Sequence, residues 1–149
     1  MRVTLQPVET EAGSADHPGA RFGLPEFGPG AVAGWGRRLV ALVVDWVLSM
    51  FAVAAFVGQD VWGGGGAGAQ WGPLVVFAAE AWVFTSLLGG SAGQLVTRLG
   101  VRRTSGRPLD PGRVLLRTLL VCLVIPPLIF NRDQQGLHDL AADSIVVRR

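Results

Sequence analysis

The stretch GWGRRLVALVVDWVLSMFAVAAFV, residues 34–57, has the pattern of a membrane span that contains one acidic side chain. Arg37 and Arg38 precede an apolar run over residues 39–57, and only Asp45 interrupts that run with a charge. A helix rises about 1.5 Å per residue, so a run of this length can cross a hydrocarbon core of about 30 Å. The stretch therefore predicts a transmembrane helix with a carboxylate inside it.

The composition of the whole chain also favours a small integral membrane protein. Half of the 149 residues are hydrophobic, 16% are charged, and the mean hydropathy is +0.42. Soluble domains usually carry roughly a quarter charged residues. All 13 basic residues are arginine, yet the formal net charge is only +2. The arginines are therefore clustered rather than spread over a cationic surface, and we expect no nucleic-acid partner.

Residue types with catalytic or metal-binding chemistry are scarce. Cys122 is the single cysteine and lies in an apolar run, which indicates a buried thiol rather than a ligand or nucleophile. His17 and His138 lie far apart, and neither has a metal-binding neighbour in sequence. The four glycines at 63–66 are not followed by the Gly-Lys-Ser/Thr of a phosphate loop. We expect no enzyme activity, no metal and no cofactor.

Two further apolar segments follow the first span. Residues 71–88 contain Glu80 as their only charge and Pro73 in the first turn, where proline is tolerated. The glycine-rich stretch between the two spans predicts a flexible loop. The third segment, residues 114–130, contains Arg117 near its start and Pro126-Pro127 near its end. Its uninterrupted part, residues 118–130, has a length more typical of a re-entrant, interfacial or buried segment, but we interpret the whole run as a third span.

These segments predict an all-α membrane protein with two to three transmembrane helices and a short C-terminal cytoplasmic or interfacial segment. Residues 1–33 are rich in proline, glycine and acids, and we expect them to form a disordered tail. Residues 34–149 then form one transmembrane domain.

Orientation follows from the arginines. Arginines precede the first span and fill the connection between the second and third segments, but the glycine-rich loop has none. By the positive-inside rule we expect the N-terminus to be cytoplasmic. We expect the protein to lie in the plasma membrane. The C-terminus is outside if the third segment crosses, and inside if that segment turns back at Pro126-Pro127. The arginines of the connection are candidates for contact with lipid headgroups or a partner: Arg98, Arg102, Arg103, Arg107 and Arg113.

Three motifs resemble the RDD family of small multi-pass membrane proteins. They are GWGRRLVALVVDWVLS at the start, GGSAGQLVTRLGVRRTSGRPLDPGRVLLRTLL in the middle, and GLHDLAADSIVV near the end. The resemblance implies that Arg38, or its neighbour Arg37, is the signature arginine, and that Asp45 and Asp139 are the two signature aspartates. It also implies a role in the transport of ligands, and the resemblance does not say which ligands these are. Gln94 stands where many members have a basic residue, and Asp143 where a glycine is common.

The intramembrane charges predict a cluster in the cytoplasmic half of the membrane. By the helical rise, Asp45 lies about 10 Å inward from Arg38, and Glu80 about 12 Å from the end of its span. Arg117 is one turn beyond Arg113. We expect Asp45, Glu80 and Arg117 to meet, because an unpaired charge in the membrane costs about 3 kcal/mol. Asp139 has an alternative pairing with Arg98 or Arg102, and His138 is expected in a structural turn.

Two functions remain open at this point. In the first, a homo-oligomer transports a small ligand or ion, with Asp45 and Glu80 as proton or cation sites and Arg117 as their counter-charge. In the second, the buried charges only hold the helices together, and the chain is a non-transporting module that assembles or anchors a membrane protein partner.

Overall fold

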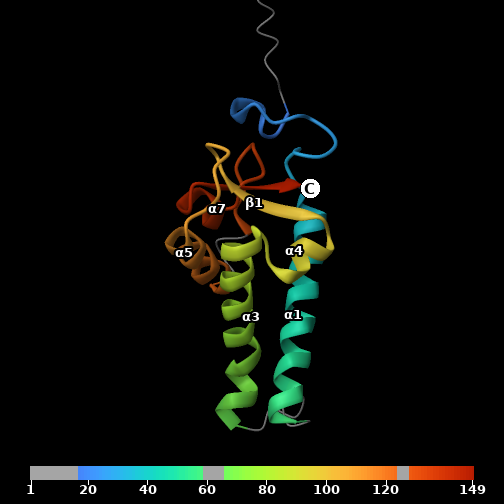
Figure 1. Cartoon of the computed structure of the whole chain (residues 1–149), viewed down its shortest axis with the longest axis vertical. Helices are drawn as coiled ribbons and strands as arrows, with labels where there is room; N and C mark the ends of the chain where they lie inside the picture. The colour runs from blue at the N-terminus through green and yellow to red at the C-terminus, as the bar shows by residue number, and fades with distance from the viewer. Residues whose placement is uncertain (1–16, 59–65, 124–127) are drawn as a thin grey trace, which may run out of the picture.

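The computed structural model describes residues 17–58, 66–123 and 128–149. The expectations for residues 1–16, for the loop at 59–65 and for Pro126-Pro127 lie outside the described residues. Two long helices, α1 (Trp35–Val57) and α3 (Gly66–Leu88), run side by side, and the smaller elements gather at one end of the pair (Figure 1).

The two long helices pack along stripes of buried residues with four-residue spacing. On α1 the buried stripe is Ala41, Asp45, Ser49 and Val53, and on α3 it includes Phe77, Ala81 and Thr85. Side chains four positions apart share one helix face, so each stripe faces the interior of the protein, where Ala41 and Asp45 of α1 lie against the short helix that follows α3. The remaining faces expose large apolar side chains. This pattern suits helices whose outer faces meet lipid.

The segments Trp35–Phe56 and Gln70–Leu88 are long and apolar enough to cross a membrane, in agreement with the two predicted spans. The helix α3 begins at Gly66, so residues 66–70 are helical and the predicted glycine-rich loop is shorter than expected. Glycine costs only about 1 kcal/mol per helical residue, which continued backbone hydrogen bonding can offset.

We call the group of small elements at the end of the hairpin the head. It consists of α4 (Ala92–Val96), β1 (Leu99–Arg103), α5 (Pro111–Cys122), α7 (Leu137–Ala141) and β2 (Ser144–Arg148). The strands β1 and β2 pair in an antiparallel sheet, with Val101 opposite Val146. The prediction of an all-α fold is therefore wrong for these two strands. Each has only five residues, and residues 144–147 are all buried, so no alternation marks them as a strand.

Residues 17–33, which the sequence predicts as part of a disordered tail, pack against β2. The side chains of Ala31 and Ala33 are buried, and Val32 forms a β-bridge with Val147. Ala33 N donates to Val146 O at 2.9 Å. The packed part of the chain therefore begins earlier than residue 34, because backbone pairing with a distant strand leaves little trace in local composition.

The third apolar segment does not form a long helix among the described residues. Helix α5 has 12 residues, and its N-cap Asp110 accepts from Arg113 N at 3.1 Å. After α7 the chain reverses at Asp143, whose φ of 52° is a left-handed backbone conformation that glycine adopts most readily. The strand β2 then returns to β1. The C-terminus thus lies at the same end of the hairpin as the arginine-bearing connection.

Candidate functional site

The side chain of Asp139 lies at the centre of the head and is fully buried. Its Oδ2 accepts from Arg38 Nη1 and its Oδ1 accepts from Arg117 Nε, each at 2.9 Å. Ser144 Oγ donates to the same Oδ1 at 3.2 Å. Since Arg38 is on α1, Arg117 on α5 and Asp139 on α7, one carboxylate joins three helices.

The carboxyl group of Asp139 is held in its ionised form. Burial raises the pKa of Asp139, but the electrostatic interactions with Arg117, His138 and Arg38 and the hydrogen bond from Arg117 outweigh that effect and lower the pKa to about 2. His138 Nε2 lies 3.4 Å from Asp139 Oδ1. The two side chains are therefore in contact, although adjacent residues on a helix are expected to point to different faces.

The structure distinguishes the two candidates for the signature arginine. The side chain of Arg38 is 11% exposed and also donates from Nε to Ala33 O at 3.0 Å. Arg37 is exposed. Arg38 is thus the arginine that contacts the second signature aspartate.

Asp45 holds the short helix α4 against α1. Its Oδ2 accepts from Ser91 Oγ at 2.6 Å, and its Oδ1 accepts from Gly93 N. A Cβ on Gly93 would collide with Ala41 O and lie 2.8 Å from Asp45 Oδ1, so only glycine permits this close approach. Asp45 therefore fixes the beginning of α4.

Glu80 contacts the same short helix from the other long helix. Its Oε1 accepts from Ala92 N at 2.5 Å. Within the part of the chain that the structure describes, Glu80 Oε2 is buried and has no hydrogen-bond partner. The start of α4 thus lies between two acidic side chains, one from α1 and one from α3.

The expected cluster of Asp45, Glu80 and Arg117 is corrected by these contacts. Arg117 pairs with Asp139, while the two acids accept backbone or hydroxyl donors at the start of α4. The sequence reasoning counted charges only and missed backbone donors. A readable signal was present: Ser91-Ala-Gly-Gln94 is a capping box, which marks a helix start.

The alternative pairing of Asp139 with Arg98 or Arg102 is also corrected, because both arginines are exposed and Asp139 is taken by Arg38 and Arg117. Arg107 is exposed as well. Two of the five arginines contact Asp143 instead of facing outward: Arg103 Nη2 lies at 3.3 Å and Arg113 Nη1 at 3.6 Å from Asp143 Oδ2. Only part of the expected headgroup-contact set is therefore free to meet lipid.

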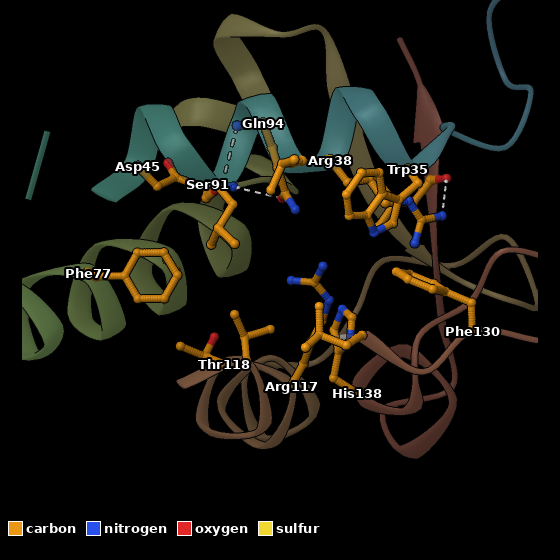
Figure 2. A pocket seen from close by; sticks show the side chains of 16 residues that line it. Trp35, Arg38, Asp45, Phe77, Ser91, Gln94, Arg117, Thr118, Phe130 and His138 are labelled. Carbon is orange, nitrogen blue, oxygen red and sulfur yellow. Dashed lines mark hydrogen bonds between the residues drawn. The ribbon is translucent and has the colours of Figure 1, made fainter. Parts of the chain in front are cut away.

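A cavity of about 110 Å³ lies between α1, α3, α5 and α7, and we call it the pocket (Figure 2). Its polar lining consists of Arg38, Asp45, Ser91, Gln94, Arg117, Thr118 and His138. Its apolar lining includes aromatic side chains from three parts of the chain: Trp35, Phe77 and Phe130. Sequence reasoning brought Arg38, Asp45 and Arg117 to one region but gave no functional role to the other polar residues.

Arg117 is the polar side chain of the pocket with the most unused hydrogen-bonding capacity. It is 7% exposed, and its guanidinium group points into the pocket (Figure 2). Its Nε donates to Asp139 Oδ1, and this is its one side-chain hydrogen bond within residues 17–58, 66–123 and 128–149. A buried guanidinium fork suits an oxyanion, because a carboxylate or phosphate accepts two parallel hydrogen bonds from it.

The described residues contain no group of three or more His, Cys, Asp or Glu side chains that could hold a metal ion.

The long apolar hairpin and the buried ion pairs at its end define a small helical membrane protein. The family model of the RDD family matches residues 32–143, and the chain belongs to this family. Comparisons with curated proteins and with solved structures give no match. The matched region contains α1, α3 and all residues of the pocket except Val146.

Proposed function

We propose that this chain is a multi-pass plasma-membrane protein that binds a small anionic ligand in the pocket and, as a homo-oligomer, carries it across the membrane. The observation that carries the proposal is the arrangement around Asp139: two arginines share one carboxylate, and the terminal nitrogens of Arg117 face a cavity. Binding and transfer of a ligand need no catalytic group, so we propose no enzyme activity.

The distribution of arginine supports a cytoplasmic location for both termini. The sequence has no arginine between Arg38 and Arg98, a range that includes both apolar helices and the loop that joins them. The head and the N-terminal segment contain the arginines, and the positive-inside rule assigns such an end to the cytoplasm. The pairing of β2 with β1 supports the same side for the C-terminus.

A homo-oligomer is proposed because two spans enclose too little wall for a path across a bilayer. The outer faces of both spans are apolar and exposed, for example at Val43 and Val75. Copies of the chain can pack there without burying unpaired charge, and the remaining surface contacts the lipid bilayer.

The acids of the original transport hypothesis keep different roles in this proposal. Both oxygens of Asp45 accept hydrogen bonds from α4, which favours a positioning role for Asp45. Glu80 Oε2 is buried and lacks a hydrogen-bond partner among the described residues, so Glu80 is the better site for a coupled proton.

Flux in proteoliposomes tests the proposal, with two probe anions: inorganic phosphate and an acidic phospholipid that has a fluorescent acyl chain. We expect the wild-type chain to carry one of the two probes, Arg117→Gln to lose this uptake, and Arg113→Gln to retain it. Arg113 is a matched control because it lies one turn earlier on α5 and is also ion-paired, but it does not line the pocket. Equal uptake by both variants would contradict the role of Arg117.

The second candidate is a non-transporting module that assembles or anchors a membrane protein partner. It is favoured by one observation: Asp139 joins α1, α5 and α7, which is what buried charges do when they only lock helices together. Exposed arginines such as Arg102 and Arg107 would then contact the partner. Co-purification of a partner that is lost when these two arginines are neutralised, without flux by the pure chain, would favour this candidate.

A further inference from the structure

The lining of the pocket is polar inside and apolar at its exposed edge. Asp45, Ser91, Arg117, Thr118 and His138 are all buried. The large lining residues with exposed side chains are apolar, and they come from α1 and from residues 128–130: Trp35, Leu39, Leu42, Leu128 and Phe130. The pocket therefore opens between α1 and this second segment, through an apolar rim.

One side of the rim belongs to α1, a helix that is long and apolar enough to cross a membrane. Trp35, Leu39 and Leu42 lie on one face of α1, near the end where the head begins. Trp46 continues this face deeper along the helix and is 43% exposed. A pocket that opens through such a face meets acyl chains rather than bulk water, because exposed apolar residues at this depth are covered by lipid.

From this arrangement we infer that the anionic ligand of the pocket is the acidic headgroup of a membrane lipid, which reaches Arg117 sideways from the bilayer while its acyl chain stays along Trp35, Leu39, Leu42 and Trp46. This inference rests on the proposed function, since it names the substrate class for the same site. An acidic phospholipid and a soluble phosphate compound both carry a phosphate group. The guanidinium group of Arg117 can bind that phosphate in either case.

The group formed by Arg38, Arg117 and Asp139 carries one net positive charge, which favours an anion beside Arg117. Arg38 and Arg117 share Asp139, and the other acid of the lining, Asp45, has both oxygens engaged by Ser91 and Gly93. Within the described residues no ion pair joins Arg117 to Asp45. Figure 2 shows the guanidinium of Arg117 in the space between α1 and α5, with His138 beside it.

The position of Trp35 provides a direct experiment. The full chain is placed in nanodiscs of phosphatidylcholine that contain a minor fraction of brominated phosphatidylglycerol or, in a second sample, the same fraction of brominated phosphatidylcholine. The contribution of Trp35 is obtained by subtracting the fluorescence of the Trp35→Phe variant from that of the wild-type chain. We expect brominated phosphatidylglycerol to be enriched at Trp35 by about five-fold, the preference that one arginine gives for an acidic headgroup.

Two variants locate the effect at the pocket. Arg117→Gln should remove the enrichment. Leu128→Asp places a negative charge on the rim without touching the buried ion pairs, and it should weaken the enrichment; Leu123→Asp is its matched control. Leu128 and Leu123 are similarly exposed, at 62% and 64%, but only Leu128 lines the pocket.

Each outcome decides between the lipid and the alternatives. Enrichment that disappears with Arg117→Gln and Leu128→Asp, but persists with Leu123→Asp and in millimolar phosphate, supports the inference. Equal quenching by the two lipids overturns it. If phosphate displaces the brominated lipid, or changes Trp35 fluorescence in pure phosphatidylcholine, the ligand is a soluble anion and only the lipid inference fails. If neither lipid nor phosphate acts on Trp35, the proposed anion site fails as well.

Discussion

Arg38 and Asp139 are separated by 101 positions in the sequence, yet Arg38 Nη1 lies 2.9 Å from Asp139 Oδ2. This ion pair joins two of the residues that the sequence resemblance assigns to the family signature, its arginine and its second aspartate. The third signature residue, Asp45, lies two turns further along α1 and holds the start of α4. Through these contacts Arg38 holds α7 against α1, and Asp45 holds α4 against α1. Arg117 adds a second ion pair to Asp139 from α5.

The shared carboxylate predicts an order of stability among variants. Asp139→Asn leaves two buried guanidinium groups without a counter-charge and should destabilise the fold by about 3–5 kcal/mol. Arg117→Gln leaves Arg38 and Asp139 as a balanced pair and should cost about 1–3 kcal/mol, mainly for a lost hydrogen bond. Thermal unfolding in detergent measures both values. A larger loss for Arg117→Gln than for Asp139→Asn would contradict the assignment of Asp139 as the shared partner.

The coupling between Arg117 and Asp139 can be separated from coupling to the intramembrane acids. Adding Asp139→Asn to Arg117→Leu should cost less than the sum of the two single changes, because the pair is removed together. Adding Asp45→Asn to Arg117→Leu should give nearly additive losses. Thermal unfolding in detergent measures these losses. Strong coupling of Arg117 to Asp45 but not to Asp139 would contradict the observed pairing and support the cluster expected from the sequence.

The close packing of α4 against α1 predicts that Gly93→Ala is destabilising. The added Cβ meets Ala41 O and the carboxylate of Asp45, so α4 must move away. Overpacking of this kind costs about 1–3 kcal/mol. Gly36→Ala is the control on α1, because a Cβ there meets no described atom within 4 Å. A melting temperature for Gly93→Ala equal to that of wild type would show that α4 does not hold this position.

The lowered pKa of Asp139 predicts a loss of stability at acidic pH. Its folded pKa of about 2 lies below the ordinary value of 3.8, so its contribution is complete above about pH 4 and is lost as the pH falls toward 2. The contribution is about 2 kcal/mol. Near-ultraviolet circular dichroism in detergent, recorded from pH 5 to pH 2, should show this loss in wild type but a weaker one in Asp139→Asn. Identical profiles would contradict it.

Cysteine labelling tests the proposed topology. In a Cys122→Ser background, cysteines replace Ala67 at the start of α3, Ser105 after β1 and Ala141 in α7, all of which are exposed. A membrane-impermeant maleimide should label Ala67→Cys in intact cells, and the other two only after permeabilisation. Labelling of Ala141→Cys in intact cells would place the C-terminus outside and contradict the shared side of β1 and β2.

Part of this fold could be predicted from the sequence because it depends on local composition. The long apolar runs identified the two helices that are long and apolar enough to cross a membrane, and the motifs identified the family. The strands could not be predicted, because residues 99–103 and 144–148 show no alternation and form only by pairing across 40 residues of chain. The same applies to residues 17–33, which gain their structure from hydrogen bonds to β2.

The candidate site was predicted only in part. The helical rise correctly brought Asp45 and Arg117 to one pocket, but charge alone could not decide their partners. Asp45 and Glu80 use backbone and hydroxyl donors at the start of α4, and such donors are invisible to a count of charged residues. His138 lines the pocket because α7 turns it inward, which depends on the tertiary position of a five-residue helix.

The central claim is that Arg117 binds an acidic ligand in the pocket, and native mass spectrometry of the chain purified from membranes in mild detergent tests it most directly. We expect the wild-type chain and Arg113→Gln to retain an adduct with the mass of an acidic lipid, and Arg117→Gln to lose it while its circular dichroism remains that of the folded chain. The same adduct in equal amount on folded Arg117→Gln would contradict the claim.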